Sequence, residues 1–207
     1  MDSVSIIFLN ILVLDFLILN CGRDFGNING VKQISLYIAG LLFNLINGLS
    51  RLLWGFLLDK LKFKKLMFLI TIIEIIVGFS LYFIVKIEVI YIIELLLVAI
   101  CIGGSLSILS PTFVEIYGLF LGPEIYGLTG ISISLSGFLG PVLISLMSKF
   151  DDYYLYTFLI GGGLCVIKLI ALILFDENEK IYDDDNDVQK KMNYEMTDNT
   201  FPVDENE

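Results

Sequence analysis

Five ionisable side chains interrupt long apolar stretches of this sequence, and their chemistry is the hardest to explain as packing alone. A charged group at the centre of a membrane-spanning helix costs about 2.5 to 3.5 kcal/mol on insertion scales, so it needs a partner, water or a charged ligand. Groups of this kind can bind a charged solute, carry a proton or form a buried ion pair. The five residues are Asp15, Arg51, Glu74, Glu94 and Lys168.

Arg51 shares one side of a predicted helix with small and amide side chains. At about 100° per residue, an arc of roughly 120° holds Gly40, Asn44, Asn47, Gly48, Arg51, Gly55 and Asp59. The planar guanidinium of arginine binds carboxylates through paired hydrogen bonds. We therefore favour a fixed cation in a polar cavity that binds an organic anion, with Asn44 and Asn47 lining the cavity. The alternative is an arginine that supports the helix end through a salt bridge or by snorkelling.

The other four charged residues admit either a coupling role or a structural one. Asp15 is a candidate proton site, cation site or gate partner, or else the water-exposed end of a helix. Glu94 lies within about two turns of the predicted outer surface, which favours solvation. Glu74 lies near the middle of its predicted helix, where a structural pair with Lys168 is favoured over a role in coupling.

Membrane-spanning helices are the elements that must position these residues. The chain is 57% hydrophobic and 17% charged, whereas soluble domains are roughly 45 to 50% apolar and about 25% charged. A span needs about 20 mostly apolar residues. Six stretches qualify, so we predict an all-α integral membrane bundle over residues 1–175, with spans at 4–22, 33–58, 65–86, 89–110, 125–148 and 154–175.

The chain ends in an acidic segment. Residues 176–207 hold 12 acidic and 3 basic side chains, which leaves −1 of the net charge of −10 for residues 1–175. Such a composition does not bury enough apolar surface to fold alone, so we expect a disordered cytoplasmic tail. A nearly neutral bundle with an anionic tail offers no basic surface to phosphate backbones, and we expect no nucleic-acid partner.

A basic link between the second and third spans sets the expected orientation. Four lysines fall within six positions, at Lys60, Lys62, Lys64 and Lys65. Clusters of this kind stay in the cytoplasm, and an even number of spans then places both termini there. Gly55 allows another helix to approach, and Asp59 can accept hydrogen bonds from amides at a neighbouring helix N-terminus. The link therefore predicts a gating loop built from Gly55, Asp59, Lys60 and Lys64.

The sequence lacks the groups that most enzymes use. It has no histidine, which removes the usual general base and every Ser-His or Cys-His relay. Cys21, Cys101 and Cys165 are isolated in apolar runs, which is typical of small buried side chains and not of disulfides or metal sites. No P-loop pattern is present. We expect no enzymatic activity, no metal and no cofactor.

The fifth predicted span, residues 125–148, is rich in small side chains that permit close approach of helices. Ser132 and Ser134 would line a path for the solute, and the step from Gly140 to Pro141 can bend the helix. Before this span, the segment 111–124, PTFVEIYGLFLGPE, has two prolines, two glycines and two glutamates. We predict that it forms a cytoplasmic joint.

The link after the second span resembles the signature loop of the major facilitator superfamily, G-x-x-x-D-[RK]-x-G-[RK]-[RK]. Gly55, Asp59 and Lys60 match its first part, and lysines close it at Lys64 and Lys65. Lysine replaces the second glycine of the pattern, and phenylalanine replaces the first of its closing basic positions.

Several motifs, taken in order, resemble the carboxyl-terminal half of the oxalate:formate antiporter and related monocarboxylate transporters. They are Asn47-Gly48 with Arg51, Cys101-x-Gly103-Gly104, PTFVEIYG and IYGLTGISISLSGFLGP. The resemblance implies that Arg51 contacts the substrate carboxylate and that residues 125–148 line the central path. Ile133 stands roughly where oxalate-type members carry a lysine, which implies a monocarboxylate in place of a dicarboxylate.

The family has twelve helices, so the resemblance implies that this chain is one half of a secondary transporter that works by alternating access. The expected partners are a small organic anion, the lipid bilayer and an amino-terminal six-helix half, from the same gene or from a separate subunit. The chain alone is then expected not to transport. The alternative is a six-helix scaffold or regulator that descends from a transporter half and interacts through its acidic tail.

Overall fold

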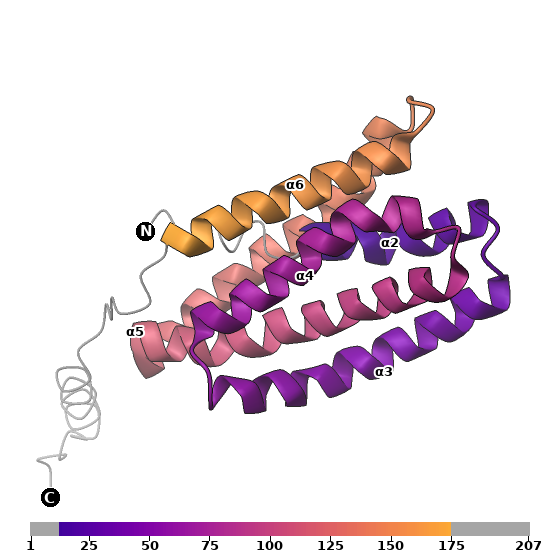
Figure 1. Ribbon diagram of the computed structural model, residues 1–207. Helices are drawn as coiled ribbons and strands as arrows, with labels where there is room; N and C mark the ends of the chain where they lie inside the picture. Colours follow the sequence, from indigo (N-terminus) through magenta and orange to yellow (C-terminus); the bar gives the residue numbers. More distant parts are fainter. Residues whose placement is uncertain (1–12, 175–207) are drawn as a thin grey trace, which may run out of the picture.

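The computed structural model describes residues 13–174, which fold into long helices joined by short links (Figure 1). A single non-helical residue divides the longest helix into a first arm, Glu88–Leu119, and a second arm, Leu121–Met147. The helices are α2 (Val13–Ile28), α3 (Gln33–Leu58), α4 (Phe63–Ile84), α5 (Glu88–Met147) and α6 (Tyr153–Leu174).

Five helical segments in the described part are long and apolar enough to cross a membrane: α3, α4, the two arms of α5, and α6. The predicted boundaries of α3, α4 and α6 agree with the structure to within about two residues. Residues 1–12, which include the first part of the predicted first span, lie outside the described part, as does the predicted tail at 176–207.

Helix α2 reaches further than the sequence indicated. The prediction ended the first span at residue 22 and placed an outer link at residues 23–32, but α2 continues to Ile28. The reason is an aromatic cluster around Phe25, whose side chain is 2% exposed. The Phe25 ring lies 5.6 Å from that of Tyr82 and 5.2 Å from that of Phe158, centroid to centroid. This packing keeps the last turns of α2 inside the bundle.

The predicted joint at residues 111–124 is a tight reversal that is helical on both sides of its turn. The first arm of α5 continues through Pro111 as a helix, and the chain turns at Gly118, where φ is 80° and ψ is 174°. This region of backbone space is essentially restricted to glycine. A Cβ on Gly122 would lie 2.8 Å from the Cα of Val114, so the two sides of the reversal are in close contact.

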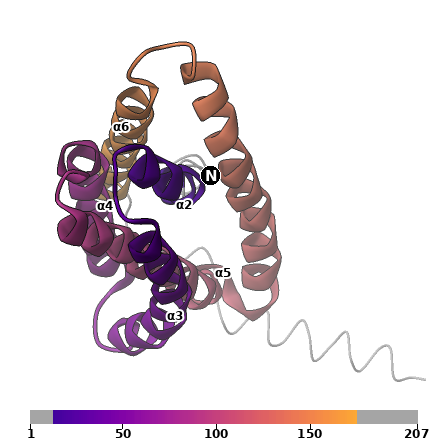
Figure 2. The ribbon, with the colours of Figure 1, turned by 90° about the vertical axis from the view of Figure 1, so that its right-hand side faces the viewer.

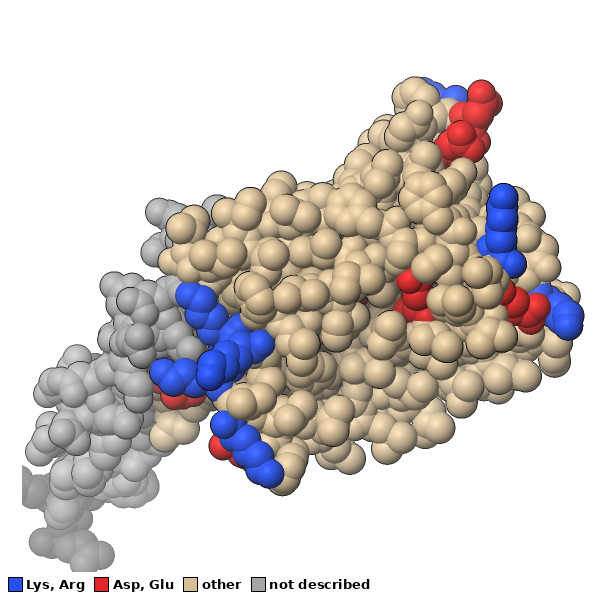
Figure 3. All heavy atoms as spheres, viewed as in Figure 1, with Lys and Arg blue, Asp and Glu red and all other residues tan. Residues whose placement is uncertain are grey.

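Seen along the bundle, α2 occupies a central position, with the second arm of α5 standing beside it (Figure 2). Helix α3 packs on the first arm of α5, and α4 packs on α6. In the space-filling view, basic and acidic side chains gather mainly at the two ends of the molecule, and the band between them is largely uncharged (Figure 3). Such a charge distribution suits a protein whose middle lies in hydrocarbon.

Helix α3 is fixed to the first arm of α5 by close backbone approach. A Cβ on Gly103 would lie 2.0 Å from the Oγ of Ser50, and one on Gly104 would lie 2.7 Å from the Nε1 of Trp54. That indole nitrogen donates a 3.0 Å hydrogen bond to the carbonyl oxygen of Ile100. The Gly103-Gly104 pair therefore has a packing explanation, since only glycine leaves room for α3 here.

Helices α4 and α6 cross at a pair of glycines, where we expect substitution to be costly. A Cβ on Gly78 would lie 2.9 Å from the Cα of Gly162, so Gly78→Ala should lower the melting temperature by overpacking worth about 1 to 3 kcal/mol. Gly163→Ala is the matched control because its Cβ would meet nothing within 4 Å. Thermal unfolding in one detergent compares the two variants, and equal melting temperatures would contradict this account of the crossing.

Candidate functional site

Arg51 lies on an exposed side of α3, among small and amide side chains. Its Nε donates a 3.3 Å hydrogen bond to the Oδ1 of Asn47, one turn earlier. Asn44 Nδ2 donates to the carbonyl oxygen of Gly40 at 3.2 Å. The helical spacing predicted that Arg51 and Asn47 share one side of α3, and the structure shows in addition that they are hydrogen-bonded there. This bond uses one guanidinium donor of Arg51 and leaves the others available to a ligand.

The side of α3 that carries Arg51 adjoins the side that packs on α5. Ser50 and Trp54 are buried against the first arm, whereas a Cβ on Gly48 or Gly55 would meet nothing within 4 Å. In the most apolar 18-residue stretch of α3 only 11% of the residues are buried, whereas the corresponding share for the first arm of α5 is 61%. An arginine in a membrane span does not face lipid without a large penalty. The exposed side of α3 is thus suited to a water-filled path or to another protein.

The second arm of α5 is similarly open, because only 12% of the residues in its most apolar stretch are buried. Ser134 is exposed, and its hydroxyl donates to the carbonyl oxygen of Gly130 at 2.8 Å. Ser132 lies on the same arm. Within the described residues no hydrogen bond joins Ser134 to Arg51. The two predicted parts of the path therefore lie on separate open helices of this bundle.

Sequence reasoning missed an arginine that shares a cavity with Asn44. A cavity of about 220 Å³ lies between α2 and α3, lined by Arg23, Gly40, Phe43 and Asn44 among others. The guanidinium of Arg23 lies 4.3 Å from the centre of the Tyr37 ring, a cation–π contact. The signal available in the sequence was Arg23 itself, which the prediction assigned to an outer link.

The predicted gating loop connects α3 to α4. Asp59 caps α3, and its amide donates to the carbonyl oxygen of Gly55 at 3.3 Å. Its side chain is exposed and takes part in no hydrogen bond or ion pair with the described residues. Lys60 Nζ lies 4.2 Å from the centre of the Phe56 ring. The predicted gating loop needs a neighbouring helix N-terminus to donate hydrogen bonds to the Asp59 carboxylate, and no such donor is found within residues 13–174.

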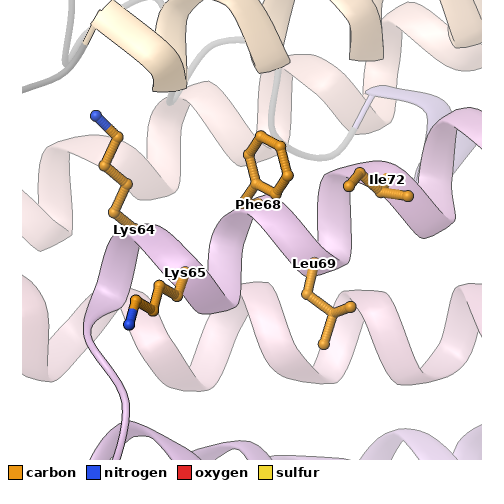
Figure 4. A pocket seen from close by; sticks show the side chains of 5 residues that line it. All are labelled: Lys64, Lys65, Phe68, Leu69 and Ile72. Atoms are coloured by element: carbon orange, nitrogen blue, oxygen red, sulfur yellow. The ribbon is translucent and has the colours of Figure 1, made fainter.

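The lysines at the start of α4 border a shallow apolar groove (Figure 4). Its volume is about 520 Å³, and the lining side chains are Lys64, Lys65, Phe68, Leu69 and Ile72. Lys64 points toward α6, where its Nζ donates a 3.0 Å hydrogen bond to the carbonyl oxygen of Ile173, and Lys65 points the other way. Lys64 thus also ties the loop to the end of α6.

Two of the buried charges form the predicted pair. Lys168 Nζ lies 2.7 Å from Glu74 Oε2, and each side chain is 1% exposed. The water-exposed alternative for Asp15 is wrong, because Asp15 is 0% exposed and its carboxyl group approaches that of Glu74. The expected solvation of Glu94 is also wrong, since it is 6% exposed and accepts a 2.5 Å hydrogen bond from the hydroxyl of Ser80.

The arrangement separates two kinds of polar chemistry. Arg51 offers an accessible cation on an open helix, which suits an anionic ligand. Asp15, Glu74 and Lys168 form a closed cluster inside the bundle, which suits ion pairing or proton binding. The three cysteines are free and buried, as the sequence indicated. Residues 13–174 contain no group of three or more His, Cys, Asp or Glu side chains that could hold a metal ion.

Comparison with known proteins supports a transport protein. No curated protein matched the chain. The sequence model of the Major Facilitator Superfamily matches residues 4–192, a range that contains all the described helices. Members of this superfamily are transporters, and the long apolar helices indicate a multi-pass integral membrane protein. The chain therefore belongs to the major facilitator superfamily.

Proposed function

We propose that this chain is the carboxyl-terminal bundle of a secondary transporter that moves a small organic anion, such as a monocarboxylate, by alternating access. The observation that carries the proposal is Arg51, an exposed cation paired with Asn47 on an open helix of a membrane bundle. A positive charge held by an amide one turn away is suited to a carboxylate ligand.

A second six-helix bundle would cover the open helices. Substrate sites in such transporters lie between two halves near the middle of the membrane, and α3 and the second arm of α5 are the least buried spans of this half. The open glycines Gly48 and Gly55 leave room for a neighbouring helix. That second bundle comes from the same gene or from another subunit, and this chain needs it for transport.

The basic link between α3 and α4 would face the cytoplasm, because lysine-rich links stay on that side. In this orientation the cytoplasmic mouth of the path is gated by Gly55, Asp59, Lys60 and Lys64. The exposed Asp59 carboxylate would accept its hydrogen bonds from the second bundle. Both termini of the bundle would lie on the same side. The second arm of α5 would contribute Ser132 and Ser134 to the path.

Solute uptake tests the proposed substrate class. The transporter that contains this bundle and its partner half is reconstituted in proteoliposomes, and uptake of labelled formate, lactate, pyruvate and oxalate is measured with and without an imposed proton gradient. We expect uptake of a monocarboxylate in preference to oxalate. Arg51 is the single basic residue of α3, and one cation matches one carboxylate. Uptake confined to a neutral or cationic solute would overturn the proposal, and a complex that moves none of these solutes would favour the scaffold alternative.

Site-directed photocrosslinking tests the pairing of halves. Cysteine at Gly48, which lies on the open side of α3, is labelled with a benzophenone maleimide in native membranes. We expect a crosslink to the amino-terminal half, whereas Ile76→Cys on α4, 59% exposed in the isolated bundle, should crosslink lipid. The native cysteines are buried and provide a low background. A product of twice the chain mass from two identical copies would contradict the pairing.

A further inference from the structure

Three ionisable side chains from three helices meet in the interior of the bundle. Asp15 comes from α2, Glu74 from α4 and Lys168 from α6, and each residue is at most 1% exposed. Glu74 lies near the middle of α4, roughly 15 Å from either end at 1.5 Å per residue. The cluster is therefore remote from water at both ends of the helices, and its residues are buried whereas Arg51 is exposed.

The contacts within the cluster leave acceptors without donors. Lys168 Nζ donates to Glu74 Oε2 at 2.7 Å. The second oxygen of Glu74 and both carboxyl oxygens of Asp15 are buried with no hydrogen-bond donor supplied by the described residues. Leu14, next to Asp15, lies at the crossing of α4 and α6, because a Cβ on Gly78 would come within 3.2 Å of its Cδ2 and one on Gly161 within 2.6 Å of its Cδ1. Asp15 interacts there with Glu74, and a proton on one of the two carboxyl groups would let it donate to the other. The missing element of the cluster is therefore a hydrogen atom between two oxygens.

The charge balance leads to the same conclusion. Two carboxylates and one ammonium leave a net negative charge, and an uncompensated charge in the interior costs several kcal/mol. Two carboxyl groups in contact do not both ionise at moderate cost. Among residues 13–174, the other titratable groups near the cluster are the thiol of Cys165 on α6, which lies against Glu74, and the thiol of Cys101 on α5. Neither thiol supplies a positive charge. One added proton makes the cluster neutral.

We propose that Asp15, Glu74 and Lys168 form a buried binding site for a single proton, which the two carboxyl groups share. The proton resides on Asp15, whose hydroxyl donates to Glu74, while Glu74 remains ionised against Lys168. Mg²⁺ or Ca²⁺ fits less well, because each takes six or more oxygen ligands and would lie beside an ammonium group. The charge chemistry of the cluster thus selects a proton.

The site joins α2 to the α4–α6 pair, so loss of the proton would place like charges between packed helices. Release of the proton then favours separation of α2 from that pair or entry of water. Use of this step to couple transport to a proton gradient rests on the proposed function. The binding of the proton does not, and it is measured on the bundle alone.

Infrared spectroscopy of the full chain in lipid nanodiscs tests the proposal at neutral pH. The wild type should show a carboxylic acid C=O band that shifts in D₂O, and Asp15→Asn should lose it. Asp24→Asn is the matched control, because Asp24 is an exposed carboxylate on the same helix. Lys168→Met should raise the band to about twice its intensity, because both carboxyl groups then need a proton. A wild-type spectrum without the band, or a band that survives in Asp15→Asn, would overturn the proposal.

The pH dependence of the melting temperature is a second readout that requires no transport. A proton held by the folded state and absent from the unfolded state makes stability fall as pH rises through neutrality. We expect this slope in the wild type, its loss in Asp15→Asn and its retention in Asp24→Asn. A slope that persists unchanged in Asp15→Asn, or a melting temperature that responds to sodium and not to pH, would refute a proton site. Either result leaves the role of Arg51 untouched.

Discussion

Replacing Asp15 by asparagine and Glu74 by glutamine together should lower the free energy of unfolding by about 3 to 5 kcal/mol. The double variant removes both carboxyl groups from the buried cluster and takes away the ion pair between Lys168 and Glu74, whose side chains are each 1% exposed. Each single variant should cost much less, because the remaining carboxyl group can ionise and compensate Lys168. The loss of unfolding free energy in the double variant should thus exceed the sum of the losses in the two single variants, as expected for groups in one network.

Adding Lys168→Met to that double variant should recover most of the loss, because methionine removes the buried charge and keeps a long side chain. Chemical unfolding of the wild type, the two single variants, the double variant and the triple variant in mixed micelles, followed by circular dichroism, gives the comparison. The double variant Asp24→Asn/Glu115→Gln, which removes two exposed carboxylates, is the matched control and should stay within about 0.5 kcal/mol of the wild type. A triple variant as unstable as the double would show that packing, and not charge, sets the penalty.

Arg51→Ala should reduce anion uptake by the reconstituted transporter by about 150-fold, which corresponds to about 3 kcal/mol of lost binding. The substitution removes a charged donor from an exposed position where its one hydrogen bond within the described residues is to Asn47. Arg51→Lys keeps the charge and loses the planar fork, so it should retain partial uptake with a raised KM. Because the side chain has few contacts within this bundle, the folding of the variants should be unchanged.

Lys149→Ala is the control for Arg51, since it removes a positive charge from the exposed link between α5 and α6. Its uptake should equal that of the wild type. Equal amounts of each protein are confirmed by quantitative blotting of the proteoliposomes. Wild-type uptake by Arg51→Ala would remove Arg51 from the binding site and would return it to the structural role that the sequence left open.

The helices and their order could be predicted because their signal is hydrophobicity over about 20 residues. The pairing of Glu74 with Lys168 was also within reach, because a buried lysine needs an acid and few are available inside the spans. The burial of Asp15 was not, since a single sequence does not tell which neighbour a helix side meets. The prediction that Glu94 is solvated failed for the same reason. Its position near the helix end could be read from the sequence, but the neighbouring hydroxyl of Ser80 on α4 could not.

Within the candidate site, predictions along one helix succeeded more often than predictions across helices. The 3.6-residue period placed Asn47 beside Arg51, and the structure has them hydrogen-bonded at 3.3 Å. The same period does not relate α3 to the second arm of α5, and Ser134 bonds within its own helix. The Arg23 cavity escaped the prediction because α2 was ended too early.

The reversal at Gly118 bears on how the protein is made. The two arms of α5 are joined by a glycine turn in which Gly122 lies directly against Val114, with no polar loop between them. We therefore expect the two spans to enter the membrane together, as one hairpin, during synthesis. The hairpin carries no basic link of its own, so the lysines between α3 and α4 must orient it as well. Loss of those lysines should then disturb the membrane orientation of four spans, namely α3, α4 and the two arms of α5.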